Sequence, residues 1–206
     1  MQRFIHMRVR SALVLAALAI AVTVGLVSGL ASVNANASKS IAIDALGDVT
    51  SGVPTQDITK ASVEKVEGVF HLTMKMAAHI PDPIPADHQW IFVLDTAPGG
   101  VGDDPDDYVI GVVTNPATSE YAGFVSYLPP GFPFDRITPT PFEVNGKEVT
   151  IFVGEDLIGD PSSLKWYALT RPANFPAPST DEVPDGAFNA TIDWQDGEVN
   201  VWTSAD

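Results

Sequence analysis

The segment Val69–Ala77, with the sequence VFHLTMKMA, decides the fold class of this chain. Apolar and polar side chains alternate strictly from Phe70 to Met76, so that every second residue is apolar. In a β-strand, successive side chains point to opposite faces of the sheet, and this alternation therefore places all the apolar side chains on one face. The segment predicts a strand that packs one face against a core and exposes the other.

Other segments extend this pattern over most of the chain. Gln89–Asp95 contains the apolar run WIFVL, which indicates a strand buried on both faces and places Trp90 in the core. The dipeptides Asn145-Gly146 and Asp196-Gly197 each lie between two candidate strands, which is the strongest local signal for a tight hairpin. The other expected strands and hairpin arms are Ser40–Leu46, Asp57–Val66, Tyr108–Thr114, Glu120–Leu128, Phe142–Val144, Glu148–Val153, Leu164–Thr170, Phe188–Trp194 and Glu198–Trp202.

Strands at about ten-residue spacing, separated by turn residues, predict an all-β fold. We expect an antiparallel β-sandwich, with jelly-roll or immunoglobulin-like layers, in a single domain over residues 38–206. The only helical feature expected is one turn within Asp156–Leu164, and Pro172–Pro184 is expected to be a long loop. Like Trp90, Tyr167 is expected in the core, because a sandwich of this size needs several large inward side chains.

The amino-terminal segment 1–37 has the features of an export signal, with the signal helix preceding the sandwich. Three arginines are followed by a charge-free apolar run over Ala12–Ala31, and Ala35-Asn36-Ala37 gives the small-x-small pattern that signal peptidase accepts. The apolar run is also long enough to span a bilayer, so an uncleaved anchor is the alternative. We therefore expect a secreted protein, extracellular or periplasmic, with no membrane span after cleavage.

Composition excludes several classes of function. Of the 206 residues, 26 are acidic and 11 are basic, and none is cysteine. Removing residues 1–37 removes three arginines and no acid, which leaves 8 basic against 26 acidic residues and a net charge of −18. Such a charge excludes general binding to nucleic acid, which needs a basic face. The absence of cysteine excludes disulfides, a thiolate nucleophile and a cysteine-bound zinc.

A series of short motifs resembles secreted β-sandwich domains related to DOMON domains and family-9 carbohydrate-binding modules. In order along the chain, these are Gly47-Asp48, Asp57-Ile58-Thr59, Trp90–Thr96, Asp107–Ile110, Val149–Val153, Leu157–Gly159, Trp166–Ala168 and Asp181–Asp185. The resemblance covers roughly residues 40–186 and implies a binding domain for a ligand such as a sugar or haem, without catalysis. Haem-binding members use a Met and a downstream His as axial ligands. Here the last histidine is His88, so no haem is expected.

The most specific local feature is an acidic loop. Asp95 ends an expected strand, and Asp103, Asp104, Asp106 and Asp107 follow across a glycine-rich turn. Several carboxylates on a short irregular loop can surround Ca²⁺, which takes six to eight oxygen ligands in flexible geometry. The spacing is not that of an EF-hand, and a solvated acidic turn is the alternative, since Asp also stabilises turns. Calcium is the only cofactor that we expect from these residues.

Aromatic residues supply the candidate ligand-binding positions. Trp194 and Trp202 flank the last expected hairpin, and Tyr108 begins an expected strand beside the acidic loop. Exposed rings stack on the C–H faces of sugars, although most large aromatic residues of a sandwich belong to its core.

Three functions follow as hypotheses, and a purely structural role outside the cell is a fourth. The first is an exported, non-catalytic module that binds carbohydrate or another cell-envelope ligand and is stabilised by calcium. The second is a small secreted hydrolase acting on polysaccharide, and the third is a haem- or redox-linked domain of DOMON type. Catalysis has the weakest support, because no Gly-x-Ser-x-Gly motif is present and pairs of acids are inevitable among so many.

Overall fold

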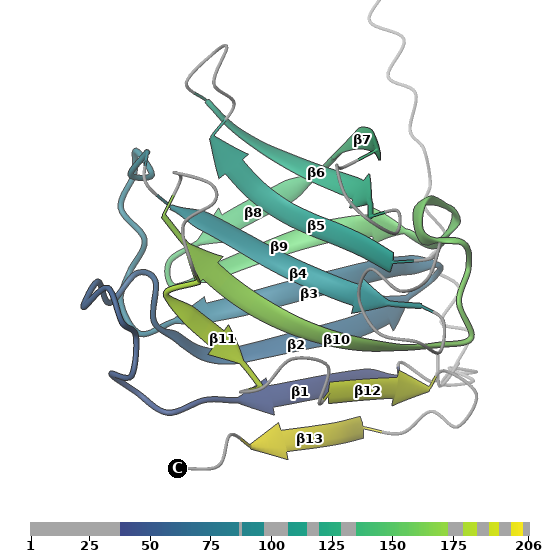
Figure 1. The fold of residues 1–206 in the computed structure, drawn as a ribbon, viewed down its shortest axis with the longest axis horizontal. Helices are drawn as coiled ribbons and strands as arrows, with labels where there is room; N and C mark the ends of the chain where they lie inside the picture. Colours follow the sequence, from purple (N-terminus) through teal and green to yellow (C-terminus); the bar gives the residue numbers. More distant parts are fainter. Residues whose placement is uncertain are drawn as a thin grey trace, which may run out of the picture. The chain divides into compact units, whose positions relative to one another are not determined.

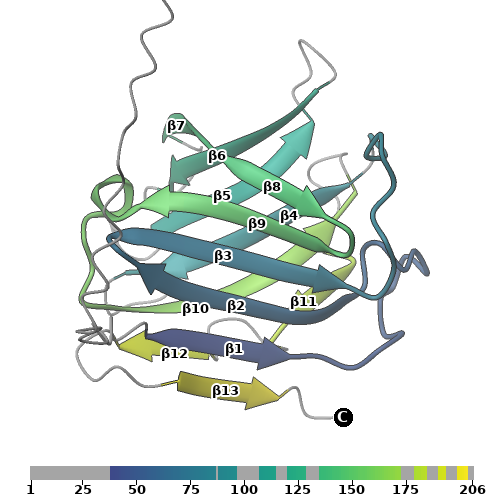
Figure 2. The ribbon, with the colours of Figure 1, turned by 180° about the vertical axis from the view of Figure 1, so that it is seen from behind.

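The alternation predicted for the segment after Val69 is present in strand β3 (Val69–Met76), whose alternate side chains are buried from Phe70 to Met76. β3 lies near the middle of a six-stranded sheet, sheet A, with the strand order β13-β1-β2-β3-β9-β8. The bounds of its other strands are β1 Lys39–Ile43, β2 Ile58–Val66, β8 Phe142–Asn145, β9 Glu148–Gly154 and β13 Val199–Thr203. Figure 2 shows sheet A in front.

The computed structural model describes residues 38–86, 88–96, 107–114, 120–128, 135–172, 179–184, 190–193 and 199–203. The described strands belong to one compact unit, Asn34–Asp206. The signal segment predicted over residues 1–37 lies outside the described residues. Among the residues that are described, no helix has the length and apolar character needed to cross a bilayer.

The second sheet, sheet B, has the strand order β11-β10-β4-β5-β6-β7, and β12 also pairs with β10. In Figure 1 it lies in front of sheet A. Its strands are β4 Gln89–Asp95, β5 Asp107–Thr114, β6 Tyr121–Tyr127, β7 Asp135–Thr140, β10 Ser163–Arg171, β11 Asp181–Val183 and β12 Ala190–Asp193. The two sheets pack face to face, so the predicted all-β, antiparallel sandwich is confirmed.

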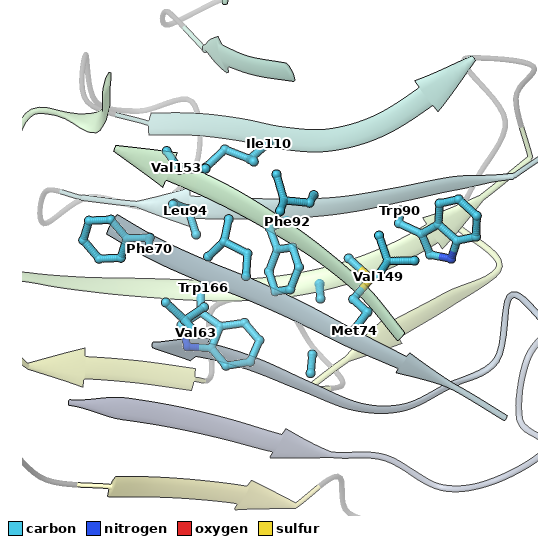
Figure 3. Packing of buried hydrophobic residues seen from close by; sticks show 14 of the residues in the cluster. Val63, Phe70, Met74, Trp90, Phe92, Leu94, Ile110, Val149, Val153 and Trp166 are labelled. Atoms are coloured by element: carbon cyan, nitrogen blue, oxygen red, sulfur yellow. The ribbon is translucent and has the colours of Figure 1, made fainter. Parts of the chain in front are cut away.

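The main core lies between the two sheets (Figure 3). Sheet B contributes Trp90, Phe92 and Trp166, and sheet A contributes Phe70 and Met74, all at 1% exposure or less. The rings of Phe92 and Trp166 are in contact, with centroids 5.9 Å apart, which is within the usual range for aromatic pairs. The placement of Trp90 in the core is confirmed.

Strand β4 is buried on both faces, as its apolar run predicts. Ile91 and Val93 belong to a second buried cluster, on the face of sheet B that points away from sheet A. Tyr167 was expected in the core between the sheets, but it is only partly buried and packs against this second cluster. The position follows from the period-two pleat of β10, because Trp166 occupies the inward face and its neighbour must therefore point outward.

The hairpin at Asn145-Gly146 is confirmed, with a shift of one residue in its turn. Asn145 pairs with Glu148, so that Gly146 and Lys147 form the two-residue loop. Gly146 has a φ of +64°, while Lys147 is not among the residues with positive φ. A positive φ at the first central residue alone matches a type II′ turn, which needs glycine at that position.

The hairpin predicted at Asp196-Gly197 is wrong. β12 pairs antiparallel with β10 in sheet B, whereas β13 pairs parallel with β1 in sheet A. The two strands flanking the dipeptide thus complete different sheets. A turn dipeptide favours a hairpin only locally, and here the open edges of two different sheets, at β10 and at β1, compete for the same two strands.

Three further differences concern irregular segments. β7 was not expected, and it contains Pro139, which a strand tolerates here because β7 is the edge strand of sheet B. β11 lies within the stretch expected to be a loop, where it extends the same edge of β10 that β12 covers. The expected helical turn is a 3₁₀-helix over Glu155–Ile158.

Candidate functional site

The outer face of sheet A, which points away from sheet B, carries a polar hollow of about 250 Å³. Strands β1, β2, β3 and β9 lie side by side beneath it (Figure 2). The side chains that line it are Lys39, Lys60, Ser62, Thr73, Lys75, Glu148 and Thr150. We refer to these seven residues as the sheet A groove.

The floor of the sheet A groove is a row of hydroxyl groups. The register pairs Ser62 with Thr73 and Thr73 with Thr150, so three adjacent strands contribute one hydroxyl each. The Oγ1 atoms of Thr73 and Thr150 lie 3.1 Å apart and share a hydrogen bond. Short hydroxyl side chains leave room above the sheet, and each can both donate and accept hydrogen bonds.

Lysines form the wall of the groove. Lys60 and Lys75 are directly opposite each other on β2 and β3, and both side chains are exposed. Within the described part of the chain, neither ammonium group lies within 4.0 Å of a carboxylate, whereas Lys39 pairs with Glu64 at 2.6 Å. Like charges directly opposite each other destabilise a sheet. On its other side Lys75 lies opposite Glu148 of β9, so Lys60 is the less compensated of the two lysines.

An aromatic pair lies on the next row of the same face. His71 and Phe152 are cross-strand partners on β3 and β9, with ring centroids 5.0 Å apart and planes at 81°. Both rings are partly exposed. They give the polar face an apolar patch close to the hydroxyl row, on the side opposite the lysine row.

A second polar constellation lies where the β1–β2 loop meets β11. Carboxylate oxygens of Asp44, Asp48 and Asp181 all lie within 4.8 Å of one another. Asp57, at the start of β2, accepts a hydrogen bond from the Gly47 N–H at 2.9 Å, and Asp181 accepts one from the Ile58 N–H at 2.5 Å. We call these four residues the aspartate cluster.

The surroundings of Asp57 and Asp181 in the aspartate cluster disfavour the ionised form of these two carboxyl groups. Burial is the main cause that raises the pKa of Asp181 to about 7, and the neighbouring carboxylates of Asp44, Asp48 and Asp57 contribute to this rise against the opposing hydrogen bond from the Ile58 N–H. Burial, together with the charge of Asp48, also raises the pKa of Asp57. Asp48 is exposed and Asp44 is partly buried, so the cluster ranges from the surface at Asp48 to the buried Asp181.

The predicted calcium loop is described only at its ends. Asp95 closes β4, is 2% exposed and has its Oδ2 3.8 Å from the Lys165 ammonium, while the backbone of Asp107 pairs with it across β5. Asp103, Asp104 and Asp106 lie outside the described residues, as does the side chain of Asp107. Calcium binding by this loop stays a prediction.

The predicted aromatic binding residues are similarly placed only in part. Tyr108 is half-buried on β5, packs against the main core and contacts Tyr127 at 5.8 Å between ring centroids. Trp194 lies outside the described residues, and Trp202 is described only through its backbone in β13. Sugar binding by these three residues stays a prediction.

Sequence reasoning missed both constellations described above. The alternation after Val69 did place His71, Thr73 and Lys75 on one face, but nothing local indicated that Ser62 and Thr150 would lie beside them. No protein-family model, curated protein or solved structure matches this chain. The resemblance to DOMON-related and family-9 binding domains therefore rests on the sequence motifs alone.

Proposed function

We propose that this chain is an exported, non-catalytic β-sandwich module that binds an acidic carbohydrate of the cell envelope in the sheet A groove. The observation that carries the proposal is the Lys60–Lys75 couple, which has no carboxylate within 4.0 Å among the described residues, beside the hydroxyl row of Ser62, Thr73 and Thr150. A sugar offers hydroxyls to the row, and a carboxylate or phosphate on the same polymer neutralises the two lysines.

The distribution of charge supports a specific acidic ligand. Four of the eight basic residues after residue 37 lie in β1, β2 and β3, although the chain beyond that point has a net charge of −18. A protein with this overall charge repels anionic polymers in general, so binding needs a locally positive surface. The sheet A groove supplies one through Lys60 and Lys75, which outnumber its single glutamate, Glu148, while its third lysine, Lys39, is paired with Glu64.

The apolar patch formed by His71 and Phe152 adds a second element of sugar recognition. Carbohydrate sites combine a few polar groups that fix orientation with an aromatic surface that covers the ring hydrogens. Here the two elements occupy adjacent rows of one sheet face. The DOMON and family-9 resemblance points to the same class of ligand.

Affinity electrophoresis tests the proposal directly. The purified chain is run through native gels that contain polygalacturonate, alginate or neutral dextran, and the polymers are analysed for breakdown products. We expect retardation by at least one acidic polymer, little retardation by dextran and no products. Lys60→Gln should weaken the retardation, since it removes one of the two opposed charges.

A matched control is Lys165→Gln, which removes one exposed lysine from sheet B, outside the groove. The control should migrate as the parent chain does in the acidic gels. Equal retardation of Lys60→Gln and Lys165→Gln would contradict the assignment to the groove. Retardation by dextran alone would contradict the acidic ligand, and polymer breakdown would contradict a non-catalytic role.

A further inference from the structure

The outer face of sheet A changes its charge from one side of the sheet to the other. Along one cross-strand row, the register through β1, β2, β3, β9 and β8 runs Ile43, Lys60, Lys75, Glu148 and Asn145. All five of these residues are exposed. The row therefore presents positive charge over β2 and β3 and negative charge over β9, which is the next strand.

The neighbouring hydroxyl row ends on the same side in a second carboxylate. From Thr150 on β9, the register continues to Glu143 on β8, and Glu143 is also exposed. Within the described part of the chain, no lysine or arginine nitrogen lies within 4.0 Å of Glu143 or Glu148. Both carboxylates therefore add negative potential to the β9–β8 side of the sheet A groove.

The spacing of these charges matches the scale of a sugar chain. Neighbouring strands of a sheet lie about 4.8 Å apart, so the backbones at Lys60 and Glu148, two strands apart, are separated by about 10 Å. Substituents on neighbouring sugars of an extended polymer are spread over a comparable length. When one sugar binds at the lysines, the next sugar toward β9 thus lies beside Glu148. Glu148 repels a second carboxylate there, whereas it accepts a hydrogen bond from a hydroxyl or an amide.

From this order of charges we infer that the sheet A groove selects a polymer in which an acidic sugar alternates with an uncharged sugar. The inference rests on the proposed function, because it narrows the ligand class of the same groove. Specificity often comes from a repulsive element against the competitor as well as from contacts to the preferred ligand. Here Lys60 and Lys75 attract the acidic sugar, and Glu148 disfavours a polymer in which every sugar is acidic.

A comparison of two polymers by affinity electrophoresis tests the inference. Hyaluronan alternates glucuronate with N-acetylglucosamine, whereas every sugar of polygalacturonate is acidic. Native gels that contain a series of concentrations of each polymer, at one pH and ionic strength, give a dissociation constant for each. We expect the parent chain to bind hyaluronan more tightly than polygalacturonate when the two are compared at equal concentrations of carboxylate.

Two variants assign the preference to the carboxylates of the groove. Glu148→Gln should strengthen binding to polygalacturonate by about two- to fivefold relative to hyaluronan, which is the usual effect of one exposed charge pair. Because Glu148 also lies opposite Lys75, its removal strengthens binding to hyaluronan as well, so the ratio of the two dissociation constants is the test. Glu143→Gln should shift this ratio in the same direction by less, because Glu143 is one strand farther from the lysines.

The matched control is Glu67→Gln, which removes one exposed glutamate from the turn between β2 and β3, outside the groove. It changes the net charge by the same amount as Glu148→Gln and should keep the ratio of the parent chain. An equal shift of the ratio in both variants would overturn the inference, since it would report net charge alone. An unchanged ratio in Glu148→Gln, or tighter binding of the parent chain to polygalacturonate, would overturn it too.

Lys60→Gln separates a failure of this inference from a failure of the proposed function. If Lys60→Gln weakens binding to both polymers while Glu148→Gln leaves their ratio unchanged, the groove binds acidic carbohydrate and only the alternating ligand is wrong. If no acidic polymer retards the parent chain, the proposed function fails and the inference fails with it.

Discussion

The raised pKa of Asp181 makes the free energy of unfolding of the chain fall as the pH rises. The carboxyl group has a pKa of about 7 in the folded chain and 3.8 as the ordinary reference value. Between pH 3.8 and about 7 the folded state keeps a proton on Asp181 that the unfolded state has lost. Each unit by which the pH rises in this range therefore lowers the free energy of unfolding. A difference of about three pKa units corresponds to about 4 kcal/mol of unfolding free energy, and the chain loses this amount progressively as the pH rises from about 4 to about 7.

Urea denaturation in EGTA at pH 4.5, 5.5, 6.5 and 7.5, followed by tryptophan fluorescence, measures this loss. Asp181→Asn removes the titrating group, so the difference in unfolding free energy between variant and parent should grow in favour of the variant as the pH rises. The buried Trp90 and Trp166 report unfolding in both chains. A difference that stays constant with pH, or that changes in favour of the parent, would refute the pKa assigned to Asp181.

Three further predictions concern the core, one close backbone contact and the lysine couple. Leu94→Ala removes a fully buried side chain of β4 and should lower the unfolding free energy by about 2–5 kcal/mol in urea denaturation, whereas a loss below about 1 kcal/mol would contradict the packed core. Gly123→Ala would place a Cβ atom 2.3 Å from the carbonyl oxygen of Thr140, so it should destabilise the chain by about 1–3 kcal/mol; an unchanged melting temperature would contradict the β6–β7 approach. Lys60→Glu, opposite Lys75, should raise the unfolding free energy by about 0.2–1 kcal/mol at low salt while abolishing binding to an acidic polymer, and a loss of stability would contradict the cross-strand pairing.

The fold class follows from local patterns because a strand records its two faces in alternate residues. For this reason the strands predicted over Phe70–Met76 and over the apolar run before Asp95 are confirmed. The turn predicted at Gly146 is confirmed because its backbone conformation, with a positive φ, is one that few residues other than glycine adopt. β7 could not be found in this way, since Pro139 opposes a strand except at a sheet edge, and the order of strands is not visible locally.

Strand order also explains why the hairpin predicted at Asp196-Gly197 is wrong. It explains as well why the sequence did not reveal the sheet A groove or the aspartate cluster. Each depends on segments far apart in the sequence. Thr73 and Thr150 are 77 residues apart, and Ile58 and Asp181 are 123 residues apart. Only the tertiary pairing of strands brings such residues together, so a search for clustered acids found the loop after Asp95 and passed over isolated aspartates.

Mapping of chemical-shift changes on the folded chain tests the proposed binding face most directly. A ¹⁵N-labelled chain is titrated with an oligogalacturonate at constant pH and ionic strength. The account predicts that the largest amide shifts fall on Ser62, Thr73 and Thr150 and on the strands that carry them. Shifts confined to sheet B, or to the segment around Trp194 and Trp202, would contradict it.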